Sequence, residues 1–281
     1  MEFDNLITSP FGLGEKLILE LLEKGESVFA IFPNPKDVPM SFLGKKNIKY
    51  GFSKLDQDPI FERILPKRIK HVFHTFELYS GKFSRVFKAN TLATLLLLEW
   101  SKNAGVESFI YLSSGEVYGE GVDLDESKEC KPHGFYATTK SQAEMLLRFF
   151  QRVFRISTVR IFFPFGEGVE QGYVYDLVET IKSGSQFNSF YSEITPTFID
   201  DIIEPLMTIR DQKDSAIYNV CGGSVSVDEL ARLISNALQT SSKAVQNRNS
   251  ILNGKCSKAK VLLNFNETPL AEAIERVFAA K

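Results

Sequence analysis

Apolar residues in this chain alternate between short runs with the period of a strand and longer stretches with the period of a helix. The alternation is most regular over the first 165 residues, where polar or glycine-containing segments separate the runs. Strands that alternate with helices are typical of a parallel sheet with helices on both faces. Strands are predicted at residues 6–8, 28–32, 48–50, 71–75, 108–112 and 156–162, and helices at residues 15–24, 83–103 and 136–150.

After Gly168 the alternation becomes looser, which indicates a smaller second lobe. Within it, Ser226 and Glu229 have the spacing of a capping box for a helix that ends near residue 238. Asp200 or Asp201 is expected to cap a helix through residue 207. Residues 239–255 are polar and are predicted as a loop. The pattern predicts an α/β fold with a doubly wound parallel-sheet domain over residues 1–165 and a smaller lobe over 166–281, and it leaves open an exchange of strands between the two.

Composition and charge narrow the classes of function. With 281 residues and a formal net charge of −2, the chain has no basic excess for binding nucleic acid or an anionic membrane. Its longest largely apolar run, residues 92–98, is too short to cross a bilayer. The three cysteines (Cys130, Cys221 and Cys256) are isolated and predict neither a metal site nor a disulfide framework. Because the chain begins without a basic and apolar leader, a cytoplasmic enzyme is expected.

Candidate chemistry lies in two neighbouring segments. Ser113 and Ser114 directly follow the predicted strand 108–112, and Tyr136 and Lys140 stand four residues apart in the next predicted helix. Residues at this spacing share a helix face. An ammonium group beside a phenol favours the phenolate, so the pair is suited to moving a proton. Tyr50 and Lys54 have the same spacing, but they lack a helical pattern and are interpreted as a chance match.

The segment Ser113-Ser-Gly-Glu-Val-Tyr-Gly119 followed by Tyr136-x-x-x-Lys140 resembles the extended short-chain dehydrogenases/reductases, in particular the NAD-dependent epimerase/dehydratase branch that acts on nucleotide sugars. Residues 157–168, 195–201 and 218–230 resemble further family segments in the family's order. The resemblance covers about residues 5–240. It implies a Rossmann-type fold with a smaller C-terminal substrate-binding lobe, a nucleotide-sugar substrate, and NAD or NADP as cofactor.

By the same resemblance, Tyr136 is the proton shuttle, and Lys140 supports it and binds the nicotinamide ribose. Ser114 is expected to hydrogen-bond the reacting oxygen, with Ser113 as the alternative. Dehydratases of the branch carry Thr-Asp-Glu where this chain has Ser114-Gly-Glu116. The missing Asp favours an epimerase or a keto-sugar reductase. Glu116 is either a catalytic group or an ordinary loop carboxylate.

The cofactor segment departs from the family pattern. The resemblance assigns cofactor binding to Thr8, Ser9, Phe11, Gly12, Gly14, Phe32 and Lys140. Ser9 replaces the first Gly of the turn, Pro10 intrudes, and one residue is missing between the last two glycines. Phe32 stands where an acidic residue normally accepts the ribose hydroxyls. Lys36 is a candidate partner for a 2′-phosphate or is simply solvated, so the choice of NAD or NADP stays open. These departures motivate an alternative: a binding or regulatory protein that has lost turnover.

The remaining expectations concern substrate, histidines and assembly. Arg160 and Phe163 lie in a segment that resembles the family's substrate site, and a guanidinium suits anion recognition. Arg160 could equally pair with a neighbouring carboxylate. His71 and His74 flank an apolar strand and are interpreted as hydrogen-bonded structural residues. The apolar surplus at residues 91–100 and 145–154 is compatible with a homodimer or with burial against the sheet.

Overall fold

The computed structural model describes residues 2–240 and 245–279. Its contacts divide the chain into two compact units, each built from separate stretches of sequence. The predicted division into residues 1–165 and 166–281 concerns cofactor and substrate binding, and it stays a prediction. The first unit consists of Met1–Ser113, Gly134–Val159 and Leu206–Ile217, and the second of Ser114–His133, Arg160–Pro205 and Tyr218–Lys281.

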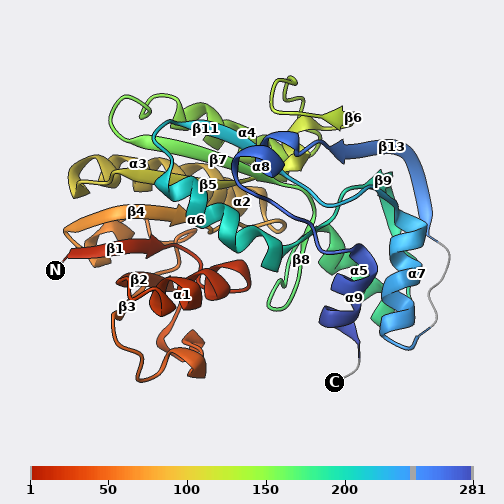
Figure 1. The fold of residues 1–281 in the computed structure, drawn as a ribbon, viewed down its shortest axis with the longest axis horizontal. Helices are drawn as coiled ribbons and strands as arrows, with labels where there is room; N and C mark the ends of the chain where they lie inside the picture. The colour runs from red at the N-terminus through yellow and green to blue at the C-terminus, as the bar shows by residue number, and fades with distance from the viewer. Residues whose placement is uncertain (1, 241–244, 280–281) are drawn as a thin grey trace. The chain divides into compact units, whose positions relative to one another are not determined.

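A seven-stranded sheet with the order β11-β7-β5-β4-β1-β2-β3 dominates the first unit (Figure 1). The pairs β1–β2, β2–β3, β1–β4 and β4–β5 are parallel. The order turns back at β1 and β4, the arrangement of a doubly wound Rossmann-type sheet. The predicted fold class is therefore confirmed. The strands of this sheet are β1 Glu2–Ile7, β2 Val28–Phe32, β3 Ile48–Phe52, β4 Arg68–His74, β5 Ser108–Ser114, β7 Arg155–Ile161 and β11 Ala216–Val220.

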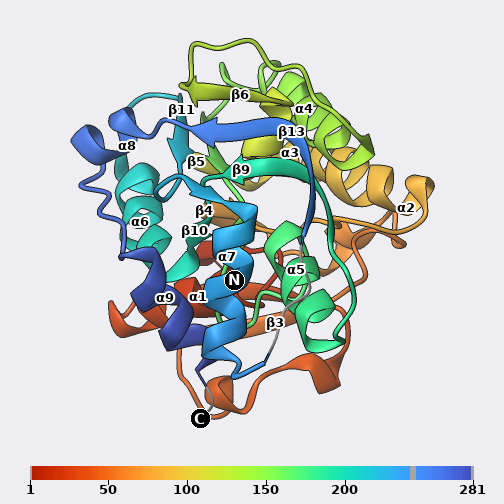
Figure 2. The same ribbon diagram turned by 90° about the vertical axis from the view of Figure 1, so that its right-hand side faces the viewer.

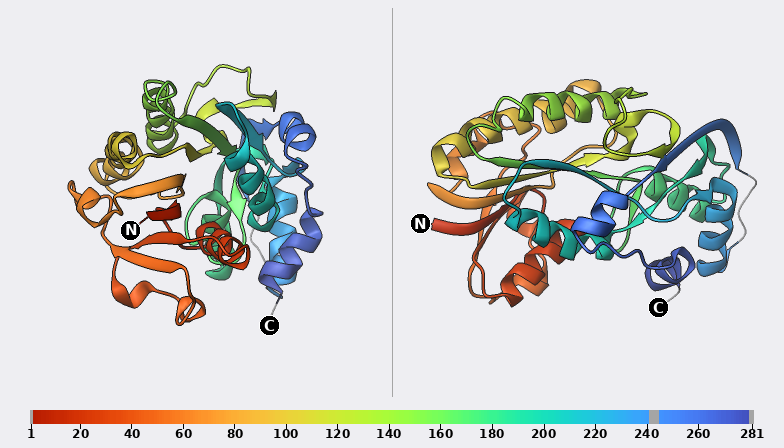
Figure 3. Two further views of the ribbon diagram at one scale, coloured as in Figure 1. Left: turned by 60° about the vertical axis from the view of Figure 1, so that its left-hand side comes forward. Right: turned by 45° about the horizontal axis from the view of Figure 1, so that its top comes forward.

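Helices cover both faces of this sheet because each presents an apolar stripe to it. Leu17, Ile18 and Leu21 of α1 are buried, as are Leu97 and Leu98 of α3. In the left panel of Figure 3, α1 lies on one side of the strands, and α3 and α4 lie on the other. The central strands β2 and β5 are buried along their whole length, as expected for parallel strands covered on both faces. These helices are α1 Leu13–Glu23, α2 Phe83–Phe87, α3 Ala93–Ala104, α4 Phe135–Leu147 and α6 Ile203–Asp211.

The helix predicted over residues 83–103 contains an irregular turn. Residues Lys88–Leu92 form a π-turn between α2 and α3. Such single turns interrupt helices frequently at functional sites. Here the turn carries Asn90, which is buried.

The second unit contains a four-stranded sheet with the order β12-β9-β13-β6. Strand β13 runs parallel to β9 and to β6, and Figure 2 shows β6, β13 and β9 in this succession. A separate parallel pair joins β8 and β10. The elements are β6 Gly121–Leu124, β8 Pro164–Phe165, α5 Tyr173–Lys182, β9 Asn188–Ile194, β10 Thr197–Phe198, β12 Val225–Ser226, α7 Val227–Ala237, β13 Gln246–Gly254, α8 Ser257–Leu262 and α9 Leu270–Phe278.

One expectation for this unit was wrong, one is confirmed and one stays open. Residues 246–254 form a strand, because their backbone pairs on both edges even though few of their side chains are apolar. Residues 241–244 of the predicted loop lie outside the described residues. Both oxygens of the Asp201 carboxylate accept hydrogen bonds from Thr268, and the cap by Asp200 or Asp201 stays a prediction. The capping box is confirmed: the Ser226 hydroxyl accepts a hydrogen bond from the Glu229 N–H.

Candidate functional site

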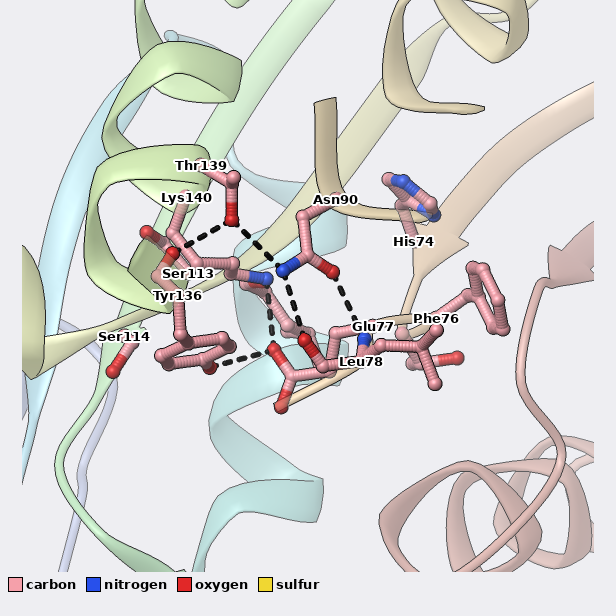
Figure 4. A network of polar contacts seen from close by, with 12 residues as sticks. His74, Phe76, Glu77, Leu78, Asn90, Ser113, Ser114, Tyr136, Thr139 and Lys140 are labelled. Carbon is pink, nitrogen blue, oxygen red and sulfur yellow. Dashed lines mark hydrogen bonds and ion pairs between the residues drawn. The ribbon is translucent and has the colours of Figure 1, made fainter. Parts of the chain in front are cut away.

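Tyr136 and Lys140 lie on the same side of α4, and both reach one acidic side chain. The Tyr136 hydroxyl donates a hydrogen bond of 2.9 Å to Oε2 of Glu77. The Lys140 Nζ lies 2.9 Å from the same oxygen (Figure 4). Glu77 follows β4 in the chain. The structure therefore brings together the two predicted residues and adds a carboxylate that the sequence did not indicate.

Lys140 is a buried cation with several partners. Its side chain is 1% exposed, and the Nζ donates a hydrogen bond of 2.5 Å to the Leu112 carbonyl oxygen. The Nζ also lies 4.5 Å from the centre of the Tyr111 ring, which permits a cation–π interaction. Burial by itself lowers the pKa of Lys140, but the negative charge of Glu77 and the contact with Tyr111 raise it above its ordinary value. Lys140 is therefore charged at neutral pH.

Asn90 joins the Glu77 loop to the helix that carries Tyr136. Its amide Nδ2 donates to the Leu78 carbonyl oxygen at 3.0 Å and to the Thr139 hydroxyl at 3.0 Å, and its Oδ1 accepts from the Leu78 N–H at 2.9 Å. The Thr139 hydroxyl in turn donates to the Tyr136 carbonyl oxygen (Figure 4). A single side chain thus fixes the backbone next to Glu77. Nothing in the sequence distinguished Asn90 from the other polar residues of the predicted helix.

The two serines after the apolar strand have different surroundings. The Ser113 hydroxyl donates a hydrogen bond of 2.6 Å to Glu144 of α4, and both side chains are buried. The Ser114 hydroxyl accepts a hydrogen bond from the Glu116 N–H and so caps the short 3₁₀ turn Gly115–Tyr118. Ser113 is thereby committed to a structural bond. The roles of Ser114 and Glu116 in catalysis stay predictions.

The predicted cofactor turn is hydrogen-bonded to the segment that follows β4. The Thr8 hydroxyl accepts hydrogen bonds from the Thr75 and Phe76 N–H groups, and the Thr75 hydroxyl donates to the Ser9 carbonyl oxygen and accepts from the Ser9 N–H. These bonds fix the carboxyl ends of β1 and β4, where the strand order reverses. Ligands of open α/β sheets bind at this position.

His74, at the end of β4, is buried between two hydroxyl groups. Its Nδ1 lies 2.9 Å from the Thr8 hydroxyl and its Nε2 lies 2.9 Å from the Thr94 hydroxyl. The predicted role as a hydrogen-bonded structural residue is confirmed. For His71 the same prediction was wrong at Nδ1, which is buried without a hydrogen-bond partner.

The turn between β1 and α1 has the close packing of a phosphate-binding turn. A Cβ atom on Gly14 would lie 1.9 Å from the Ser9 carbonyl oxygen, so only glycine allows this approach of helix and turn. Gly12 stands at the N-terminus of α1, which has no side-chain cap. The uncapped N–H groups of a helix start are suited to a phosphate. The altered spacing of the glycines therefore still gives a compact turn ahead of a helix.

An aromatic cluster occupies the end of β2. The Phe32 ring is buried and has edge-to-face contacts with Phe11 at 5.8 Å, Tyr50 at 5.6 Å and Phe42 at 6.3 Å. The Tyr50 hydroxyl donates to the Phe42 carbonyl oxygen, which supports its interpretation as a structural residue. The four aromatic residues of this cluster offer no carboxylate to a ribose.

Arg160 and Phe163 are both buried in the second unit. The Arg160 guanidinium donates a hydrogen bond of 2.7 Å to the Tyr118 hydroxyl and lies 4.8 Å from the centre of that ring. Phe163 has a positive φ of 44°, a conformation that costs energy for a bulky residue, and its ring packs against Tyr173 and Tyr191. Substrate binding by Arg160 and Phe163 stays a prediction.

Among the described residues there is no cluster of three or more His, Cys, Asp or Glu side chains that could hold a metal ion. Within the same ranges, no helix is long and apolar enough to cross a membrane.

Comparison with protein families gives one match. The model of the "NAD dependent epimerase/dehydratase family" matches residues 13–221. Among curated relatives, UDP-glucose 4-epimerase of Haemophilus influenzae is 27% identical over 179 residues, covering 57% of this chain and 53% of that protein. GDP-6-deoxy-D-mannose reductase of Pseudomonas aeruginosa is 29% identical over 181 residues, covering 58% of this chain and 60% of that protein. The chain thus spans little more than half the length of these relatives.

Solved structures extend the similarity to nearly the whole chain at the level of the fold. MoeE5 in complex with UDP-glucuronic acid and NAD has a TM-score of 0.81 at 24% identity, with 96% of both chains covered. UDP-glucuronic acid 4-epimerase from Bacillus cereus, in complex with UDP-glucuronic acid and NAD, has a TM-score of 0.83 at 20% identity, with 98% of both chains covered.

Proposed function

Because the chain belongs to the NAD-dependent epimerase/dehydratase family, we propose that it is a nicotinamide-dependent epimerase or keto-reductase of a nucleotide-activated sugar. The observation that carries this proposal is the geometry of α4. Tyr136 and Lys140 share one face and reach the same Glu77 oxygen at 2.9 Å, beside the reversal point of the sheet. A phenol held next to a buried ammonium is suited to exchanging a proton with a sugar hydroxyl.

The residues of the first unit fit a dinucleotide in two places. The compact turn at Gly12 and Gly14 would hold the pyrophosphate at the start of α1, and Lys140 would hydrogen-bond the nicotinamide ribose. The apolar surroundings of Phe32 supply no acidic partner for the adenosine ribose, so these residues do not select NAD over NADP. When bound, the nicotinamide supplies or accepts a hydride at the sugar carbon.

The protein's own groups would handle the proton and the orientation of the sugar. Tyr136 gives a proton to, or takes one from, the oxygen at the reacting carbon. Lys140 keeps a positive charge close to the Tyr136 hydroxyl. Ser114 hydrogen-bonds the same oxygen, a role for which Ser113 is unsuited because its hydroxyl is bound to Glu144. Arg160 and Phe163 are proposed to contribute to the substrate-binding lobe.

The lack of space for a side chain at position 115 argues against a dehydratase. Dehydration would need an acid at this position, and a Cβ atom on Gly115 would lie 2.4 Å from carbon atoms of the Phe162 ring. Any side chain here would force that buried ring to move, at a cost in packing. Glu116 alone supplies one carboxylate where the elimination of water uses an acid and a base. Epimerisation and keto reduction eliminate no water and need no acid and base besides Tyr136.

Replacing Tyr136 by Phe tests the proposal. Turnover of a panel of UDP-, dTDP- and GDP-linked sugars, followed by nicotinamide absorbance and by product analysis, should fall by a factor of about 10²–10⁴, because the proton-transfer group is lost. Tyr50→Phe is the matched control, since Tyr50 has the same spacing to a Lys and bonds a backbone carbonyl oxygen. The control should keep its activity. Full activity of Y136F would refute the assignment.

Titration with NAD(H) and NADP(H), followed by nicotinamide fluorescence, separates the enzyme from a binding protein of the same family. Binding of one dinucleotide together with turnover supports the enzyme. Binding of a nucleotide sugar without dinucleotide binding or turnover would support the non-catalytic alternative.

We also propose a homodimer, supported by exposed apolar side chains in α4 and in the turn that follows it. Met145 is 58% exposed, Phe149 80% and Val153 49%. Exposed apolar side chains that gather in one place are typical of an interaction surface. Light scattering during size-exclusion chromatography should give twice the chain mass for the protein and the monomer mass for Phe149→Glu.

A further inference from the structure

Glu77 contributes a negative charge to the pair on which the proposed function rests. Its Oε2 accepts the hydrogen bond of Tyr136 and also neutralises Lys140, both at 2.9 Å. The Glu77 side chain is 24% exposed, whereas that of Lys140 is 1% exposed. Figure 4 shows the carboxylate lying between the phenol and the ammonium.

The direction of the hydrogen bond determines which form of Tyr136 is stabilised. A carboxylate that accepts the phenol proton stabilises the phenol, and a negative charge next to the oxygen disfavours the phenolate. The positive charge of Lys140, which by itself favours the phenolate, is balanced by Glu77. Of these contacts, the hydrogen bond to Glu77 is the one that acts to keep the proton on Tyr136.

The other groups around the three residues do not reverse this balance. The ring of Tyr79 packs against that of Tyr136 at 4.7 Å and carries no charge at neutral pH. Burial raises the pKa of Tyr111 to about 12, so the ring under Lys140 is also neutral. His74 is neutral because burial and the charge of Lys140 lower its pKa to about 3. Glu144 of α4 adds negative charge on the same side of the balance as Glu77, and its Oε1 accepts the hydrogen bond of Ser113.

We propose that Glu77 is a positioning residue that holds Tyr136 as a phenol, the protonation state from which keto reduction by the proposed enzyme begins. In keto reduction Tyr136 must begin as a proton donor. The hydride of the reduced nicotinamide forms the new C–H bond, the carbonyl π pair moves to oxygen, and that oxygen takes the Tyr136 proton. The phenolate that remains is stabilised by Lys140 and takes a proton back from water. In the oxidation of an alcohol Tyr136 must begin as the phenolate, which Glu77 opposes.

The experiment uses Glu77→Gln, which keeps the size and a hydrogen-bond acceptor but removes the charge. Tyr136 is observed by NMR of the protein with ¹³C-labelled tyrosine rings, and its signal is assigned with Y136F. The titration midpoint of Tyr136 should fall by about 1–3 pH units in E77Q, because Lys140 then acts on the phenolate alone. Glu144→Gln is the matched control, since it removes a buried charge of α4 that bonds Ser113 instead of Tyr136, and it should move the midpoint much less than E77Q does.

A second measurement connects the Tyr136 titration to turnover. The alkaline limb of the pH profile for keto reduction should move to lower pH in E77Q, in step with the titration midpoint of Tyr136, because reduction needs the phenol form. An unchanged Tyr136 midpoint in E77Q would overturn the proposal, whatever the activity. A shifted midpoint in a protein that turns over no sugar would leave the electrostatic role of Glu77 intact and refute the proposed function instead.

Discussion

Replacing His74 by Asn should make the stability of the protein much less sensitive to acid. His74 is enclosed by hydroxyl groups whose own protons are already placed. The Thr94 hydroxyl donates to the Asn90 carbonyl oxygen, so it accepts from the imidazole Nε2–H. The Thr8 hydroxyl accepts from two N–H groups and donates to Nδ1. The neutral tautomer satisfies every bond, and a second ring proton would find no acceptor.

The size of the effect follows from the pKa of His74. Burial, and then the charge of Lys140, lower it to about 3, whereas the unfolded chain keeps the ordinary value of 6.5. The unfolded state therefore takes up a proton near pH 6.5 that the folded state refuses, and stability is lost as the pH falls from there towards 3. Each full unit inside this window costs about 1.4 kcal/mol, and since the unfolded His is only half protonated at about pH 6.5, acidification from about pH 6.5 to about pH 4.5 costs about 2 kcal/mol through this residue.

Urea unfolding curves at about pH 7 and about pH 4.5 measure this cost. The loss of stability on acidification should be smaller in His74→Asn than in the unchanged protein by about 2–3 kcal/mol, even though the variant is less stable at neutral pH. His133 is exposed and serves as the control, because His133→Asn should not change the slope. Equal slopes for H74N and the unchanged protein would show that His74 becomes protonated in the folded state and would refute the reasoning.

Three further predictions concern other parts of the structure. Asn90→Ala removes three hydrogen bonds, of which the one to Thr139 is fully buried, and should cost about 2–3 kcal/mol in urea unfolding, with faster hydrogen exchange at the Leu78 N–H; unchanged exchange would contradict the role of Asn90. The Cys256 thiol is buried and donates a hydrogen bond to the Cys221 carbonyl oxygen, so iodoacetamide should alkylate this site slowly in the folded protein and quickly in urea, as measured by mass spectrometry of its peptide; fast alkylation in the folded protein would contradict the burial. Hydrogen bonds from Lys70 and Ser27 hold the pKa of Asp4 well below its ordinary value. Asp4→Asn should therefore destabilise the protein at neutral pH, and the difference in unfolding free energy should disappear only in strong acid. A difference that stays constant from neutral pH to strong acid would contradict this role of Asp4.

The first unit could largely be predicted because its strands and helices differ in period. The predicted strands and helices of residues 1–165 correspond to β1 to β5, β7, α1, α2, α3 and α4. The strand β13 was missed because its residues include Gln246, Asn247, Arg248 and Asn249, whose polar side chains give no strand pattern. That strand is held by backbone pairing on both sides, which the sequence does not record.

The candidate site could be predicted only where it is local in the chain. Tyr136 and Lys140 were found because one helical turn brings them together. Glu77 is 59 residues away from Tyr136, and its place follows from the order of the strands and from the Asn90 bonds that fix its loop. A carboxylate in a loop after a strand is ordinary in a sequence. The contact of Glu77 with Tyr136 and Lys140 can be recognised only when the structure places this loop beside α4.

The interleaving of the two units has a consequence for synthesis on the ribosome. The first unit is complete only when residues 206–217 have been made, although most of it lies before residue 114. These late residues carry most of α6 and the beginning of the edge strand β11, which lies next to β7. Until they emerge, the outer edge of β7 has no partner, and unpaired strand edges promote aggregation. A fragment that ends near residue 165 would keep that open edge permanently, so it is a poor candidate for separate expression.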